Sequence, residues 1–143
     1  MIYSRALLLD THAAIWLAEG KLSDSVLAHV VYAGLADGVF VSPVSAWEIG
    51  LLARPRPGGQ PKVTFLPDPQ AWFATLLSKP IIKEAPLTSA AAIESSCLPG
   101  RFHGDPADRL LVATARMTEI PILTRDKRIL AYSNAGHVKA VRC

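Results

Sequence analysis

The sequence predicts an α/β protein built on a parallel β-sheet with helices on both faces. Short apolar runs alternate with segments whose apolar residues recur at helical spacing, which is typical of β-α-β units. The first run, Ala6 to Leu9, has no polar position, as expected for a strand covered on both faces. It ends at Asp10, which we expect at the carboxyl end of the strand, the edge where open α/β sheets bind ligands.

Length and composition narrow the class of protein. With 143 residues, half of them apolar and a fifth charged, the chain fits one domain over residues 1–143. No apolar run approaches the ~20 residues of a membrane-spanning helix, and we expect a cytoplasmic protein with no secretory signal. A net charge of +3 is compatible with a polyanionic partner but does not identify one. Cys97 and Cys143 lack a metal-type spacing.

The first half of the chain is expected to form two strands and three helices. A short helix over 11–18 follows Asp10, and after Gly20 a second helix, capped by Ser23, runs to about residue 35. A strand over 39–41 then leads into a helix that begins at Ser42-Pro43, where a capping residue precedes the proline favoured at the first helical position.

The middle of the chain begins with a proline-rich stretch, 54–69, which cannot be a helix and is a candidate interaction arm. Asp68-Pro69 opens a helix through Leu77 by the same cap-and-proline pattern. We expect a third strand over 81–84 and a helix that Thr88 caps.

The last part repeats the pattern of helix and strand. After a turn-rich loop over 98–104, Asp105-Pro106 opens a helix that includes 110–117. A fourth strand over 121–124 ends just before Asp126, and 138–141 is expected as a last strand at an edge.

Four carboxylates should meet at one edge of this sheet. Asp10 and Asp126 each follow a strand, and Glu48 lies about a turn and a half into a helix, from which it reaches back toward that edge. Asp108 falls in the first turn of another helix. Clustered carboxylates repel one another unless a cation neutralises them, and oxygen ligands favour Mg²⁺ or Mn²⁺.

Such an ion would stabilise the transition state of phosphodiester hydrolysis. We expect Asp10 and Asp108 to be the direct metal ligands, with Asp126 and Glu48 binding a second ion or a metal-bound water. Whether one or two ions are needed stays open.

Each acidic residue also has a purely local explanation. Asp105 is expected to cap its helix, and Asp108 sits at the third helical position, where the helix dipole favours a carboxylate. Asp126 would cap a short terminal helix, and Glu48 would be a solvated helix residue. Asp10 is the hardest to explain in this way.

Neighbouring residues are auxiliary candidates. Thr11 and Thr124 could orient a carboxylate or bind a phosphate, with capping preferred for Thr11. Three tryptophans fall on apolar helical faces and are expected in the core: Trp16, Trp47 and Trp72. Four basic residues near the acidic positions could meet substrate phosphates or form an ordinary solvated surface: Arg109, Arg125, Lys127 and Arg128. We do not expect a catalytic histidine.

Four segments, in order and spanning nearly the whole chain, resemble the VapC-type toxins of the PIN-domain family. They are Leu8-Leu9-Asp10-Thr11-His12, Ser45-Ala46-Trp47-Glu48-Ile49, the stretch 103–115 around Asp105-Pro106-Ala107-Asp108-Arg109, and Leu123-Thr124-Arg125-Asp126. The resemblance implies a three-layer α/β/α fold with a central, mostly parallel sheet. It places the acidic positions of the family on Asp10, Glu48, Asp108 and Asp126, and leaves Asp105 as an extra carboxylate of open role.

The resemblance also implies a function. The protein would be a Mg²⁺- or Mn²⁺-dependent endoribonuclease, the toxin of a type II toxin–antitoxin pair. It would form a homodimer and a hetero-oligomer with a cognate VapB-type antitoxin, whose amphipathic helix would dock on apolar grooves near the first helices. The RNA that is cut does not follow from the sequence.

Two other classes of protein stay open on the residues alone. An aspartyl-phosphate protein also places an aspartate after a first parallel strand, although His12 stands where a dehalogenase-type phosphatase has its second aspartate. A metal-free module that binds RNA or protein could keep the same fold without catalysis.

Overall fold

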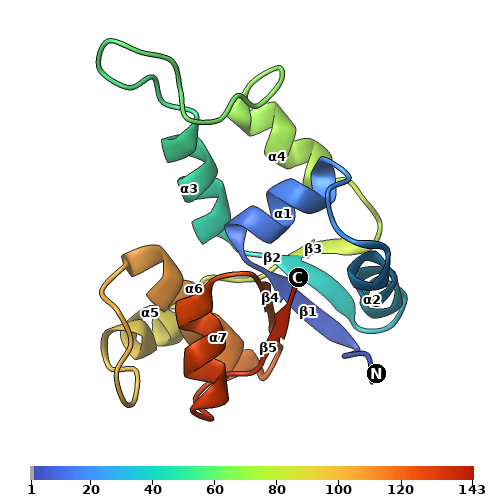
Figure 1. The fold of residues 1–143 in the computed structure, drawn as a ribbon, viewed down its shortest axis with the longest axis vertical. Coiled ribbons are helices and arrows are strands. Elements are labelled where there is room, and N and C mark those ends of the chain that lie inside the picture. Colours follow the sequence, from blue (N-terminus) through green and yellow to red (C-terminus); the bar gives the residue numbers. More distant parts are fainter. Residues whose placement is uncertain (1) are drawn as a thin grey trace.

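The computed structural model describes residues 2–143, which form a five-stranded sheet in the order β3-β2-β1-β4-β5 (Figure 1). The strands are β1 (Ala6–Leu9), β2 (Gly38–Val41), β3 (Ile82–Glu84), β4 (Ile122–Thr124) and β5 (Ala140–Arg142). The helices are α1 (Thr11–Ala18), α2 (Asp24–Leu35), α3 (Pro43–Leu52), α4 (Pro69–Leu77), α5 (Ser89–Ser96), α6 (Pro106–Thr118) and α7 (Lys127–Asn134). Every strand pairing is parallel, which confirms the predicted fold class.

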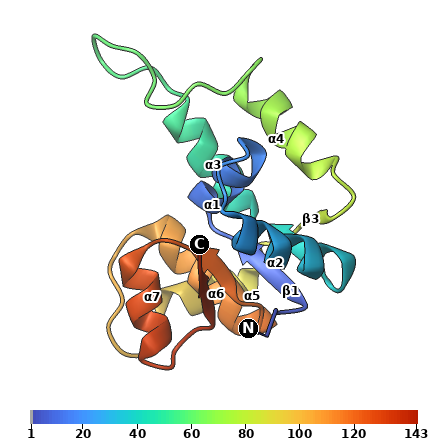
Figure 2. The same ribbon diagram turned by 45° about the vertical axis from the view of Figure 1, so that its right-hand side comes forward.

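The helices cover the sheet from two sides. Helices α1 to α4 lie on one face and α5 to α7 on the other (Figures 1 and 2). The first strand shows why both layers form, because its side chains alternate between the faces. Leu7 and Leu9 belong to the apolar core under α1 to α4, whereas Leu8 belongs to the core under α6 and α7. All three leucines are almost completely buried, as predicted for a strand covered on both faces.

The strand order creates a functional edge. From β1 the chain moves outward to β2 and β3, then crosses back to β4 on the other side of β1. The order therefore reverses between β1 and β4, and ligands bind outside the carboxyl ends of strands at such a switch point. Asp10 directly follows β1, and Asp126 lies two residues after β4.

Capping residues explain why the helix starts could be predicted. A side-chain oxygen at the N-cap accepts a backbone hydrogen bond at every helix in residues 2–143. The caps are Asp10, Ser23, Ser42, Asp68, Thr88, Asp105 and Asp126. The preference for Thr11 as a cap was wrong, because Asp10 takes that position and Thr11 is the first helical residue.

The tryptophans divide between core and surface. Trp72 is half-buried and packs edge-on against Phe65, with the ring centroids 5.0 Å apart, so it lies at the margin of the core where a core position was expected. Trp47 is 51% exposed, so the core prediction is wrong there. Helix α3 is apolar on more than one face, and Val44 and Ile49 occupy its buried side. The loop before α4 is anchored to the core by Val63 and Phe65, while its remainder projects from the body (Figure 1).

Within residues 2–143, no helix combines the length and the apolar character that crossing a membrane requires.

A buried histidine joins α2 to the segment before β1 and predicts a pH effect on stability. His29 Nε2 accepts a hydrogen bond from the backbone N–H of Ser4 at 2.7 Å, and Tyr3 stacks on its ring. Burial lowers the pKa of His29 below 6.5, so the unfolded chain takes up this proton first as the pH falls. The stabilisation is complete above about pH 6.5 and is lost as the pH falls from there to the lower pKa of the folded state.

We therefore expect the melting temperature to fall more steeply between pH 7.5 and 5.5 in the wild type than in His29→Gln, whose amide oxygen can still accept the bond without titrating. Thermal unfolding followed by circular dichroism across this range provides the comparison, and equal slopes for the two proteins would contradict the assignment.

Candidate acidic active site

One pocket of about 370 Å³ lies at the carboxyl ends of β1 and β4. All five acidic residues singled out from the sequence line it, together with polar, aromatic and basic neighbours. The lining residues are Asp10, Thr11, His12, Trp16, Glu48, Asp105, Asp108, Arg125, Asp126 and Arg128. Residues from widely separated parts of the chain therefore meet where the strand order reverses.

Asp10 is held in the floor of this pocket and is only 8% exposed. One carboxylate oxygen accepts the backbone N–H of Ala13 at 2.7 Å, and the other accepts the hydroxyl of Thr124. Burial raises the pKa of Asp10 above its usual value, although these two hydrogen bonds oppose the shift. Its orientation is thus fixed by helix α1 on one side and by strand β4 on the other.

Thr124 connects the two strand-end aspartates. Its hydroxyl donates to Asp10 and accepts the backbone N–H of Asp126 at 3.0 Å. The side chain is completely buried, so it cannot meet a substrate phosphate. Of the two roles considered for Thr124, the structure shows the one that orients a carboxylate.

Glu48, on helix α3, is hydrogen-bonded to a residue of helix α1. The Thr11 hydroxyl donates to the Glu48 carboxylate and is hydrogen-bonded to the Ser45 hydroxyl at 3.0 Å. Burial raises the pKa of Glu48, and the charges of Asp105 and Asp10 add to this effect. Glu48 is therefore not a freely solvated helix residue. Ser45 was not predicted as part of the site, although its place three residues before Glu48, on the same side of α3, was a usable signal.

Asp105 and Asp126 act as helix caps while they line the pocket. Asp105 accepts the backbone N–H groups of Ala107 at 2.9 Å and Asp108 at 3.2 Å. Asp126 accepts those of Arg128 at 2.8 Å and Ile129 at 3.1 Å. Partial burial acts to raise the pKa of Asp126, but these bonds and the Arg128 guanidinium outweigh it and keep the pKa low. The cap and pocket positions are compatible, because the helices begin at the edge of the pocket.

Asp108 is the pocket carboxylate whose pKa is raised to near neutrality. Burial, followed by repulsion from Asp105, Asp126 and Glu48, raises its pKa to about 7. Its side chain does not complete a reciprocal capping box, since the backbone N–H of Asp105 is bonded instead to His103 Nδ1 at 3.3 Å. The Asp108 carboxylate is left facing the other acidic groups.

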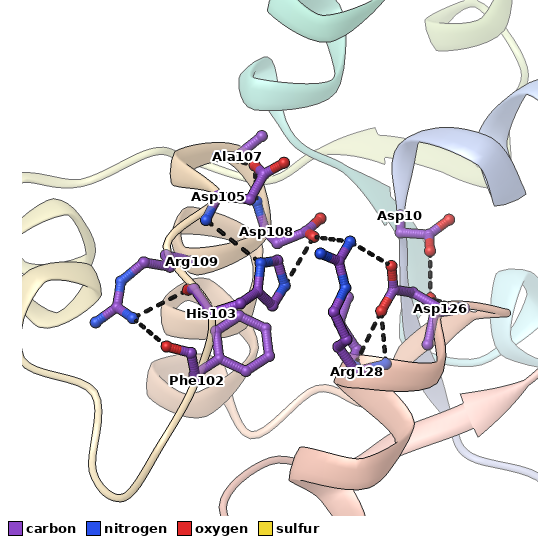
Figure 3. Close-up of polar contacts among 11 residues, drawn as sticks. Asp10, Phe102, His103, Asp105, Ala107, Asp108, Arg109, Asp126 and Arg128 are labelled. Carbon is purple, nitrogen blue, oxygen red and sulfur yellow. Dashed lines mark hydrogen bonds and ion pairs between the residues drawn. The ribbon is translucent and has the colours of Figure 1, made fainter.

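Two nitrogen groups approach Asp108 (Figure 3). His103 Nε2 lies 3.1 Å from its carboxylate and an Arg128 guanidinium nitrogen lies 3.6 Å away. The His103 contact is close but not aligned as a hydrogen bond. Burial and the charge of Arg128 lower the pKa of His103, so the ring is neutral near pH 7 and supplies no full positive charge.

Basic and aromatic side chains form the rim of the pocket. The Arg125 guanidinium lies 4.1 Å from the ring centroid of Trp16, a cation–π distance, and its Nε donates to the carbonyl of Cys143 at 3.0 Å. Arg128 pairs with Asp126 at 3.2 Å. Trp16 is half-buried at this rim, so the prediction that it lies in the core is wrong.

Arg109 points away from the acidic pocket. Its guanidinium donates to the backbone carbonyl of Ser95 at 2.8 Å, and to those of Phe102 at 3.0 Å and His103 at 3.2 Å, the two bonds that Figure 3 shows. The structure therefore corrects its candidacy as a phosphate ligand, because its donors already fasten the loop before α6 to the end of α5. Lys127 is exposed and does not line the pocket either.

Loss of this fastening should destabilise the fold. Arg109→Met leaves three carbonyls without their charged donor, and we expect the free energy of unfolding to fall by about 2 kcal/mol. Arg109→Lys should recover little, because an ammonium cannot reproduce the planar fork. Urea unfolding measures both, and Arg101→Met on the same loop is the control, with an expected change within about 0.5 kcal/mol. A stability of Arg109→Met equal to that of the control would contradict this role.

The donor chemistry of the pocket fits a hard divalent cation. Its acidic groups are all carboxylates, the ligands that a hard divalent cation prefers, and burial together with their mutual repulsion raises the pKa of Asp108 to about 7. Within residues 2–143, no three His, Cys, Asp or Glu side chains are disposed as a finished metal-binding set. Asp10, Asp105 and Asp126 are partly engaged by caps, and Glu48 by Thr11.

A sequence match that spans most of the described fold identifies the family. Residues 7–135 match the model of the PIN domain family, and the protein belongs to that family. It is 29% identical to Ribonuclease VapC22 of Mycobacterium tuberculosis over 125 residues. This alignment covers 87% of this chain and 90% of the relative. The family inferred from four short motifs is thereby confirmed.

Solved structures share the fold at lower sequence identity. One is VapBC2 from Rickettsia felis bound to a DNA fragment from their promoter, with a TM-score of 0.70, 12% identity, and 96% of this chain and 98% of that chain covered. Another is VapBC-5 from Mycobacterium tuberculosis, with a TM-score of 0.58, 21% identity, and 98% and 100% covered. These similarities support the fold described above, a parallel sheet between two layers of helices.

Proposed function

We propose that this protein is a metal-dependent endoribonuclease of the VapC type and the toxin of a type II toxin–antitoxin pair. The observation that carries the proposal is the single pocket in which five carboxylates converge at the switch point of the sheet. The similarity to Ribonuclease VapC22 supports RNA as the substrate class.

The proposed cofactor is Mg²⁺, with Mn²⁺ as a substitute. Asp10 and Asp108 would hold it, with Glu48 and Asp126 as further ligands or as acceptors for a bound water. Bound there, the cation would supply Lewis-acid stabilisation of the charge that develops on the scissile phosphate.

The chain itself would contribute orientation and charge. Thr124 and the backbone N–H of Ala13 hold the Asp10 carboxylate in one orientation, and Thr11 does the same for Glu48. Arg125 and Arg128 at the rim are placed to attract the polyanionic backbone and to bind phosphates next to the one that is cleaved. The attacking water would lose its proton toward one of the pocket carboxylates.

Cleavage of a mixed, structured RNA pool by the purified protein tests the proposal. We expect cuts with Mg²⁺ and with Mn²⁺ and none in excess chelator. A folded protein that binds RNA but cuts nothing with either metal would support the non-catalytic module instead. Phosphate that is incorporated at Asp10 and released by hydroxylamine or alkali would point to the aspartyl-phosphate class.

We further propose a VapB-type antitoxin as the partner, which the VapBC assemblies among the structural neighbours support. Helix α2 exposes Leu27, Val31 and Leu35, at a four-residue spacing that presents one apolar stripe. An amphipathic helix could cover this stripe. Val31→Lys should prevent co-purification with the antitoxin encoded beside this protein, whereas Ser25→Lys, at an exposed position of the same helix outside the stripe, should not. A homodimer of the toxin is proposed as well, and light scattering of the isolated protein tests it.

A further inference from the structure

A second hollow adjoins the acidic pocket. It measures about 420 Å³, within the roughly 300–1,000 Å³ typical of ligand sites. It lies between the loop that precedes α6 and the exposed side of α7. Arg128 lines both hollows, and His103 lines this one while its Nε2 lies 3.1 Å from Asp108 of the other. An extended polymer bound in the acidic pocket would therefore continue directly into the second hollow.

Aromatic rings form the wall of this hollow. The ring centroid of Phe102 lies 4.4 Å from that of His103 and 4.8 Å from that of Tyr132, and Phe102 is tilted relative to both rings (Figure 3 shows Phe102 and His103). Phe102 is half-buried, so part of its ring faces the hollow. Planar rings at a concave surface are suited to stacking against a planar ligand.

The wall is held in place before any ligand binds. Tyr132 donates its hydroxyl to the carbonyl of Pro99, and Arg109 donates to the carbonyls of Phe102 and His103. The loop is thus fastened at both ends of the aromatic row, which reduces the entropy lost on binding.

The charge at the hollow indicates an anionic chain. Arg101 and Arg128 are both exposed at its edge. No carboxylate in residues 2–143 forms an ion pair with Arg101, so its charge is available to a ligand. No acidic side chain lines this hollow, in contrast to the neighbouring pocket.

From these observations we infer that the aromatic hollow binds one unpaired nucleobase of an RNA strand whose phosphate backbone runs through the acidic pocket. This rests on the proposed function, and it adds a base-binding subsite to it. The base stacks on Phe102 and His103, and Arg101 binds a flanking phosphate. A paired base has no free face to offer, so the subsite selects single-stranded or looped RNA.

Equilibrium binding tests this without requiring catalysis. The probes are a short fluorescent oligouridylate and an abasic ribose-phosphate chain of the same length, and fluorescence anisotropy is measured in excess chelator. Phe102→Leu keeps the apolar volume but removes the flat ring, and Ala131→Leu fills the hollow from α7. We expect each to weaken oligouridylate binding roughly tenfold and to leave the abasic chain unaffected. Arg101→Gln should weaken both probes.

Ala92→Leu, at an exposed position of α5 that does not line the hollow, is the matched control and should bind like the wild type. Equal affinity of the wild type for the two probes, or oligouridylate binding unchanged in both Phe102→Leu and Ala131→Leu, would overturn the subsite. If the protein cuts no RNA yet shows the base-dependent loss, the proposed catalysis fails and the subsite stands. If it cuts RNA and the two variants bind normally, the subsite alone fails.

Discussion

Asp108→Asn is expected to lower RNA cleavage at least about 10³-fold, which corresponds to roughly 4 kcal/mol of lost transition-state stabilisation. An amide is a weak ligand for Mg²⁺ and cannot accept a proton from an attacking water. The same change should stabilise the protein in chelator. Burial and three neighbouring carboxylates raise the pKa of Asp108 to about 7, so its charged form is costly in the folded state at pH 8. One pKa unit corresponds to about 1.4 kcal/mol, but solvent screening and the loss of the attraction to Arg128 reduce the effect, so a gain of roughly 2 kcal/mol is expected.

Opposite effects on activity and stability separate this role from a structural one. Single-turnover cleavage and urea unfolding in chelator give the two quantities. Asp10→Asn should lose activity to a similar extent, because its oxygen can still cap α1 while its charge is gone. Asp24→Asn in the first turn of α2, distant from the pocket, is the control and should cleave normally. Cleavage by Asp108→Asn within tenfold of the wild type would remove Asp108 from the proposed site.

Thr124→Val is expected to reduce both stability and activity although no atom of Thr124 can reach a substrate. The substitution keeps the shape of a fully buried side chain but removes its hydroxyl. The Asp10 carboxylate then loses a donor and the backbone N–H of Asp126 loses its acceptor. Leaving two such groups unpaired should cost about 2–3 kcal/mol of unfolding free energy. Because Asp10 is no longer held in one orientation, cleavage should fall about tenfold.

Thr124→Ser retains the hydroxyl and should restore most of both properties. Calorimetry measures Mg²⁺ binding to each variant under conditions where the protein is folded. It shows whether the lost activity arises at the proposed metal site. Weaker Mg²⁺ binding in Thr124→Val than in Thr124→Ser is expected. Equal Mg²⁺ binding and equal cleavage in these two variants would show that the hydroxyl serves stability alone.

The strands and helix starts could be predicted because their causes are local. A strand buried on both faces has no polar position, as in Ala6 to Leu9, and a cap such as Asp105 precedes a proline whose backbone suits the first helical turn. The acidic residues could be placed near one edge for the same reason, since Asp10 and Asp126 follow parallel strands. Trp47 shows the limit, because an apolar residue on an apolar helix does not reveal which side packs against the core.

The sequence by itself determined the order of elements, the parallel sheet and the identity of four carboxylates in the pocket, and it left the role of Asp105 open. Only the tertiary structure decided what the residues next to these carboxylates do. It joined Thr124 to Asp10 across 114 positions of sequence, and it turned Arg109 from a candidate phosphate ligand into a fastening for the loop before α6. The physical reason is the range of the interactions. Capping and strand burial depend on residues a few positions apart, whereas the direction of a side chain and the pKa of a carboxylate depend on groups that only packing brings together.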